Sequence, residues 1–224
     1  MIDYSKFLNN SIQEIKPSGI RKFFDIASEM DDVISLSIGE PDFQTPWHIR
    51  EEGINSLKNG KTWYSPNRGF AQLREEIANY YARRFNISYE GKTQVLVTVG
   101  GSEAIDLAFR CLVSEGDEVI IPEPSFVCYE PLTHMAGGKA VIINTKAEDQ
   151  FRLKADDLEK AITDKTKLVV LPFPNNPTGA IMEKADLEAI VQVVKEHDLF
   201  VISDEIYSEL TYVDKHVSIA SFPG

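Results

Sequence analysis

The feature that most constrains the fold of this 224-residue chain is a series of short, continuously apolar runs separated by amphipathic segments. The runs are rich in Val, Ile and Leu and show no apolar–polar alternation. Strands of this kind are buried on both faces, as in a parallel sheet that helices cover on two sides. The predicted fold is therefore α/β, a three-layer α/β/α arrangement with a mainly parallel sheet. The predicted strands are Val95–Val99, Glu118–Ile121, Ala140–Asn144, Leu168–Leu171 and Leu199–Ile202.

The segments between these runs show helical spacing. In one segment, apolar residues lie on one side of a predicted helix and charged residues occupy the positions between them; the apolar residues are Leu73, Ile77, Tyr80, Tyr81 and Phe85. The first 45 residues are irregular apart from one predicted helix and one short apolar run. The helices predicted besides residues 73–85 are Ile20–Met30, Ser102–Val113, Ser125–Met135, Ala155–Ile162 and the segment around Leu187–Val194, and the apolar run is Val33–Ile38.

Composition excludes several classes of partner. A formal net charge of −12 disfavours nucleic acid and anionic membrane surfaces, because like charges repel. The two cysteines, Cys111 and Cys128, belong to no CxxC motif and no His/Cys cluster, so we expect reduced thiols and no metal site. The N-terminus lacks a signal-peptide pattern, and no apolar stretch approaches the ~20 residues that cross a bilayer. We therefore expect a cytoplasmic protein.

Ligands of open parallel sheets bind beyond the carboxyl ends of the strands, so the residues that follow each predicted strand are candidates for a site. Gly100-Gly101-Ser102-Glu103 follows the first strand and opens a helix. Unpaired N–H groups and the helix dipole make such a helix start a binding site for an anion such as phosphate. A tight turn with a serine N-cap explains the same residues without a ligand.

The next strand ends contribute an aromatic ring, an amide and a carboxylate. Phe126 could form a flat wall for a planar ligand or belong to the core. Asn176 precedes a proline, which favours an extended conformation, and its amide could donate to a ligand or only form a turn. Asp204 follows an apolar strand and needs a partner, either a cationic ring nitrogen or a backbone N–H, and Tyr207 could face the same side. Together these groups match a planar, phosphorylated, nitrogen-containing aromatic ligand.

The motifs at these positions resemble those of the pyridoxal-phosphate (PLP)-dependent aminotransferases of fold type I, class I/II, in their N-terminal portion. The resemblance covers essentially the whole chain, and the motifs come in family order. They are Gly39-Glu40-Pro41-Asp42-Phe43, Tyr64-Ser65-Pro66-Asn67-Arg68-Gly69 with Leu73-Arg74, Val97-Thr98-Val99-Gly100-Gly101-Ser102-Glu103-Ala104, Pro174-Asn175-Asn176-Pro177-Thr178-Gly179 and Ser203-Asp204-Glu205-Ile206-Tyr207.

The resemblance implies a cofactor, PLP, and a role for each site residue. Asp204 would pair with the pyridinium nitrogen of PLP, and Phe126, where many members have tryptophan, would stack on its ring. Asn176 and Tyr207 would hydrogen-bond the 3-oxygen of the ring. The remaining implied contacts are backbone N–H groups of Gly101, Ser102 and Glu103 to the phosphate, Tyr64 to the phosphate of the neighbouring subunit of a homodimer, and Gly39 to the substrate carboxylate.

The resemblance also implies that the Schiff-base lysine lies beyond Gly224, so that no catalytic residue is expected in this chain and the chain alone is expected to be inactive. Lys215 lies in a polar turn and is not expected to replace that lysine. Residues 1–45 would form an N-terminal arm and part of a small domain, and residues 46–224 a PLP-binding large domain that is truncated and incomplete at the C-terminus.

The parent enzyme would be an aminotransferase that moves an amino group between an α-amino acid and a 2-oxo acid. Two alternatives stay open: a PLP-dependent carbon–sulfur lyase of the same fold, and a non-catalytic remnant that binds PLP or only dimerises. The amino-acid specificity is not readable from these residues.

Overall fold

The structure is a computed structural model that describes residues 4–15, 19, 26, 29–30, 34, 43–213 and 215–224. The chain divides into two compact units, one of residues 1–15 with 68–224 and one of residues 16–67. The second unit contains helix α3, Trp47–Lys58. The predicted helix Ile20–Met30 and the apolar run Val33–Ile38 lie largely outside the described residues. The predicted domain boundary after residue 45 stays a prediction.

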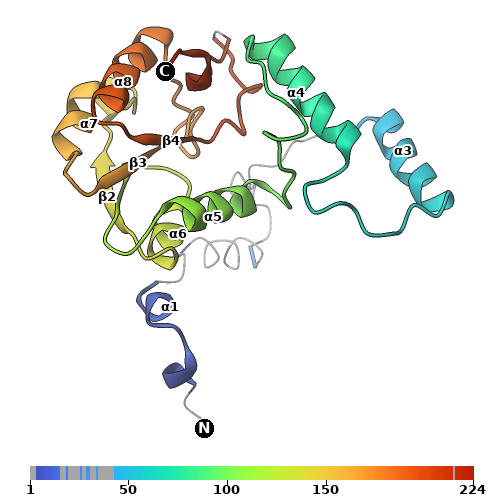
Figure 1. Ribbon diagram of the computed structural model, residues 1–224, viewed down its shortest axis with the longest axis horizontal. Helices are drawn as coiled ribbons and strands as arrows, with labels where there is room; N and C mark the ends of the chain where they lie inside the picture. The colour runs from blue at the N-terminus through green and yellow to red at the C-terminus, as the bar shows by residue number, and fades with distance from the viewer. Residues whose placement is uncertain are drawn as a thin grey trace. The chain divides into compact units, whose positions relative to one another are not determined.

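The larger unit is built on a parallel sheet of four strands in the order β2-β1-β3-β4 (Figure 1). Ile120 of β1 pairs with Val141 of β2 on one side and with Val169 of β3 on the other. All four strands coincide with predicted apolar runs, within one or two residues at most ends. Their bounds are β1 Glu118–Glu123, β2 Lys139–Asn144, β3 Thr166–Leu171 and β4 Phe200–Ser203.

Helices cover both faces of the sheet, because successive strand residues point to opposite sides. Helices α7 (Ala155–Ala161) and α8 (Lys184–Glu196) lie on one side of the sheet, and α5 (Gly101–Leu112) and α6 (Tyr129–Met135) lie on the other (Figure 1). Ile120 and Val169 pack in a core with α7 and α8, whereas Val119 and Val170 pack in a second core with α5 and α6. All four of these strand residues are fully buried. The predicted α/β fold, a parallel sheet flanked by helices, is therefore confirmed.

The predicted helices of the larger unit are also present. Helix α6 begins four residues later than predicted, at Tyr129, because Pro131 is tolerated only in a first helical turn. No helix of the described residues has the length and apolar character needed to cross a membrane. The bounds are α1 Asn10–Glu14, α4 Ala71–Phe85, α5 Gly101–Leu112, α6 Tyr129–Met135, α7 Ala155–Ala161 and α8 Lys184–Glu196, with short 3-10 turns at Ser5–Phe7, Ala147–Asp149 and Ile219–Ser221.

The prediction of a strand at Val95–Val99 is wrong for the described structure. This segment is irregular, and Val97 donates its N–H to the carbonyl of Arg68 at 3.2 Å instead of pairing with a strand. Val95 is buried, but Val99 is 92% exposed. A β-branched run becomes a strand only where a partner strand accepts its backbone hydrogen bonds, and none of the described strands is its neighbour.

Candidate functional site

A cavity of about 160 Å³ lies at the carboxyl ends of β1, β3 and β4, beside the start of α5. Six of the nine predicted site residues line it together, although they come from four separate parts of the chain. The polar and glycine residues of the lining are Gly101, Ser102, Tyr129, Asn176, Asp204 and Tyr207, and the apolar residues are Ile105, Phe126, Pro172, Pro174 and Ile206.

The start of α5 forms one end of the cavity. Its N-cap residue, Gly100, has φ 86°, a left-handed conformation that strains any residue with a side chain. Because glycine provides no capping group, the first N–H groups of the helix, from Gly101, Ser102 and Glu103, have neither an intrahelical partner nor a side-chain cap. The Glu103 carboxylate accepts the N–H of Val99. Only the backbone N–H of Glu103 is therefore available for the predicted contact with a phosphate.

The carboxylate of Asp204 lies in the same cavity and is oriented by two donors. Its Oδ2 atom accepts the hydroxyl of Tyr129 at 2.8 Å, and its Oδ1 atom accepts the N–H of Ile206 at 3.2 Å. The Tyr129 side chain is only 2% exposed. Burial, and next the charge of Asp204, raise the pKa of the Tyr129 hydroxyl, so it remains a donor at neutral pH. Each carboxylate oxygen keeps room to accept a second hydrogen bond.

Tyr129 is a site residue that the sequence reasoning missed. The available signal was a tyrosine three residues after Phe126, in the same strand-end segment. Cys128 beside it is half-buried, and burial together with the charge of Asp204 raises the pKa of its thiol to about 12. Cys128 is therefore an unreactive thiol at neutral pH.

The walls of the cavity are an aromatic ring, two prolines and two polar side chains. The Phe126 ring is 40% exposed and meets the Tyr129 ring edge to face, with 6.3 Å between centroids. The side chains of Asn176 and Tyr207 line the cavity and make no hydrogen bond to any residue that the structure describes. These two groups are therefore available to a ligand.

Three other positions considered from the sequence are not part of the described cavity lining. Tyr64 belongs to the unit of residues 16–67, where its side chain is exposed. Gly39 lies outside the described residues. Lys215 is exposed and is not part of the cavity lining.

The chemistry of the donor set fits a phosphorylated aromatic cation. Free N–H groups at a helix start favour a phosphate, an oriented carboxylate favours a protonated ring nitrogen, and a flat ring favours an aromatic plane. The fold and the site thus define an α/β protein with a binding cavity at the carboxyl edge of a parallel sheet, where such proteins bind cofactors.

Comparison with known proteins identifies the family. The family model for aminotransferase class I and II matches residues 31–222, and the chain belongs to this family, whose members use PLP. The chain is 49% identical to the putative aminotransferase YugH of Bacillus subtilis over 98% of its own length and 57% of that protein. It is 46% identical to the aspartate aminotransferase of Pyrococcus abyssi over 97% of its length and 56% of that enzyme.

A solved structure agrees with the fold. The crystal structure of Pyrococcus protein-A1 superposes with a TM-score of 0.93 at 46% identity, covering 96% of this chain and 56% of that one. The chain therefore spans a little over half the length of the relatives it matches.

Proposed function

We propose that the cavity binds PLP, with the phosphate on the N–H groups of Gly101, Ser102 and Glu103 and the ring against Phe126. Asp204 would accept a hydrogen bond from the protonated ring nitrogen. The observation that supports this most strongly is that the unpaired helix start and the oriented carboxylate line one cavity. Asn176 and Tyr207, whose side chains have no described partner, would donate to the 3-oxygen of the ring.

The role of this chain is to hold a proton on the ring nitrogen. When bound, PLP supplies the electron sink of amino-acid chemistry once that nitrogen is protonated. A carboxylate beside the nitrogen favours the charged form and raises its pKa by ~1–3 units. Tyr129 and the N–H of Ile206 hold the Asp204 carboxylate fixed in direction, because both donate to it.

The whole protein to which this chain corresponds would be an aminotransferase that transfers an amino group between an α-amino acid and a 2-oxo acid. Family membership and the named aminotransferases among its relatives support this reaction. A homodimer in which Tyr64 contacts the phosphate of the neighbouring subunit is part of the proposal, and the exposure of Tyr64 is compatible with it. Cytoplasmic location remains a prediction from the sequence.

The test is binding of pyridoxamine 5′-phosphate, which carries the ring and phosphate of PLP but no aldehyde to react with surface lysines. Asp204→Asn is expected to weaken binding about tenfold or more, since each pKa unit corresponds to a factor of ten. The control variant Asp156→Asn removes the same charge from an exposed position at the start of α7, on the other face of the sheet.

Two outcomes would refute the proposal. Equal affinity of the Asp204→Asn and Asp156→Asn variants would show that the Asp204 carboxylate does not contribute to binding. Equal affinity for pyridoxamine with and without its phosphate would show that the start of α5 does not bind the phosphate. For the reaction of the whole protein, glutamate formation from 2-oxoglutarate and an amino donor identifies a transaminase, whereas release of ammonia and pyruvate identifies a carbon–sulfur lyase.

A further inference from the structure

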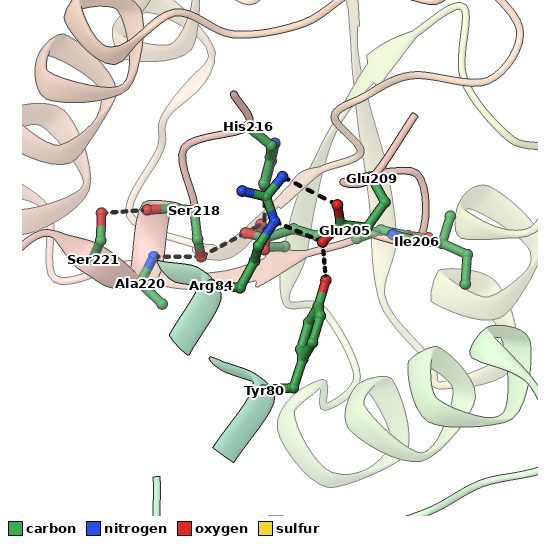
Figure 2. A network of polar contacts seen from close by, with 11 residues as sticks. Tyr80, Arg84, Glu205, Ile206, Glu209, His216, Ser218, Ala220 and Ser221 are labelled. Carbon is green, nitrogen blue, oxygen red and sulfur yellow. Dashed lines mark hydrogen bonds and ion pairs between the residues drawn. The ribbon is translucent and has the colours of Figure 1, made fainter. Parts of the chain in front are cut away.

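The turn after β4 has a second carboxylate, that of Glu205, which is not part of the cavity lining. Asp204, Ile206 and Tyr207 line the cavity, but Glu205 between them does not. Its side chain is only 9% exposed and lies against the segment that precedes the last 3-10 turn (Figure 2). A carboxylate this deeply buried needs several partners.

Glu205 has three such partners, which with it form a group that we call the Glu205 cluster: Ser203, Glu205, His216 and Ser218. Its Oε1 atom accepts the hydroxyls of Ser203 and Ser218, both at 2.8 Å. Its Oε2 atom lies 3.3 Å from Nε2 of His216, a buried nitrogen that is close enough for an ion pair but not aligned for a hydrogen bond.

The Glu205 carboxyl is ionised at neutral pH in these surroundings. Burial opposes ionisation, but the interactions with His216, Ser218 and Ser203 outweigh it and lower the pKa of the Glu205 carboxyl. Two other titratable groups lie near it, Tyr81 in α4 and Tyr89 after it: burial, and next the charge of Glu205, raise the pKa of both hydroxyls. The carboxylate therefore joins residues 203–205 to residues 216–218 as a charged, hydrogen-bonded anchor.

The anchor matters because few backbone hydrogen bonds join the turn to the rest of the protein. The N–H of Asp204 continues the pairing of β4 with β3 by donating to Leu171 at 3.0 Å. Beyond that point the backbone bonds are local, from Ser208 to Glu205 at 2.9 Å and from Leu210 to Tyr207 at 2.8 Å. The side chain of Glu205 is thus the main polar link between this turn and the segment of residues 216–218.

We propose that Glu205 is a positioning residue, which holds the turn against residues 216–218 and thereby fixes Asp204 and Tyr207 at the cavity. This inference rests on the proposed function for its effect on the cofactor, but its effect on the turn does not depend on any ligand.

The same turn supplies a matched control. Glu209 also forms short polar contacts, with Tyr80 and, through two hydrogen bonds of 2.7 and 3.1 Å, with Arg84 (Figure 2). Its side chain is 51% exposed. These contacts connect the turn to α4 and not to residues 216–218. The loss of this pair leaves every contact between the turn and residues 216–218 in place. Glu209→Ala therefore removes a carboxylate from the same turn without removing the proposed anchor.

The first experiment measures hydrogen–deuterium exchange of the full chain without ligand. Glu205→Ala is expected to speed exchange about tenfold or more at the amides of residues 206–210, because hydrogen bonds to a charged group are lost. Glu209→Ala is expected to change these rates much less. Glu205→Gln keeps the shape and one acceptor oxygen, so it is expected to restore much of the protection. Equal acceleration in the two alanine variants would overturn the proposal.

The second experiment follows pyridoxamine 5′-phosphate bound to the same variants, reading the pH at which its ring absorption changes. A variant that is merely less stable would leave that pH unchanged. Glu205→Ala is expected to move it toward the value of the free compound and to weaken binding about tenfold, with partial recovery in Glu205→Gln. Unchanged values in Glu205→Ala would overturn the positioning role.

The two experiments separate the two proposals. If the unaltered chain does not bind pyridoxamine 5′-phosphate, the proposed function fails, while the exchange data still decide whether Glu205 anchors the turn. If Glu205→Ala does not fold, the milder variant Ser218→Ala takes its place, because it removes only one hydrogen bond of the Glu205 cluster. This variant is expected to speed exchange at residues 206–210 in the same way.

Discussion

Replacing Tyr129 with phenylalanine removes a single hydroxyl from the candidate site and keeps the buried ring. The lost interaction is the 2.8 Å hydrogen bond to Asp204 Oδ2. Hydrogen bonds to charged groups contribute about 1.5–3 kcal/mol. The lower end applies here, since Asp204 lines an open cavity where water can replace the hydroxyl and since the N–H of Ile206 still donates to Oδ1. We expect the free energy of unfolding to fall by about 1.5 kcal/mol.

Urea denaturation followed by far-UV circular dichroism measures this change. Tryptophan fluorescence is unsuitable, because Trp47 and Trp63 both lie in the unit of residues 16–67 and not in the unit that contains the site. For a domain of this size about 1.5 kcal/mol corresponds to a Tm lower by roughly 3–6 °C.

The control is Tyr212→Phe. Tyr212 is 94% exposed, and its hydroxyl donates to no described residue, so its removal should change stability by less than about 0.5 kcal/mol. If Tyr129→Phe were no more destabilising than this control, the contact between Tyr129 and Asp204 would add no net stability, and the claim that Tyr129 orients the carboxylate would have to be abandoned.

Three further predictions follow from the structure. The free energy of unfolding should fall as the pH drops below about 4.5, the ordinary pKa of a glutamate. The cause is the lowered pKa of Glu205, which makes the folded state bind fewer protons than the unfolded state. Urea titrations at several pH values should show a flatter pH dependence of the unfolding free energy in Glu205→Gln. Gly100→Ala should destabilise the protein by about 1–2 kcal/mol, since φ is 86° at this position. Gly101→Ala, inside the helix, should not destabilise it. Equal decreases in Tm for the two variants would contradict the strain at Gly100. Phe126→Ala should weaken pyridoxamine 5′-phosphate binding several-fold and Phe126→Trp should not, as fluorescence titration can show, and unchanged affinity in Phe126→Ala would exclude stacking.

Much of the fold is predictable from the sequence because burial dictates it locally. The runs at Glu118–Ile121 and Leu168–Leu171 are apolar at nearly every position, and the structure buries both of their faces. Val95–Val99 has the same composition but no partner strand among the described ones. Composition indicates that a segment can form a strand, whereas pairing depends on distant residues that the local pattern does not contain.

The candidate site is likewise predictable from the sequence only in part. The carboxylate of Asp204 follows β4, so topology alone places it at the carboxyl edge of the sheet. The turn at Gly100 follows a segment that pairs with no described strand, and it reaches the same cavity because α5 packs against the sheet. The hydrogen bond between Tyr129 and Asp204 joins residues 75 positions apart, and no periodicity marks it. The link between Glu205 and Ser218 runs through irregular backbone, where sequence spacing says little about distance.

A crystal structure of this chain with pyridoxamine 5′-phosphate shows directly where the ligand binds. We expect a phosphate on the N–H groups of Gly101, Ser102 and Glu103, with the ring nitrogen at hydrogen-bonding distance from the Asp204 carboxylate. A ligand bound outside this cavity, or one bound in it with the nitrogen turned away from Asp204, would show that this cavity is not a PLP site of the proposed kind.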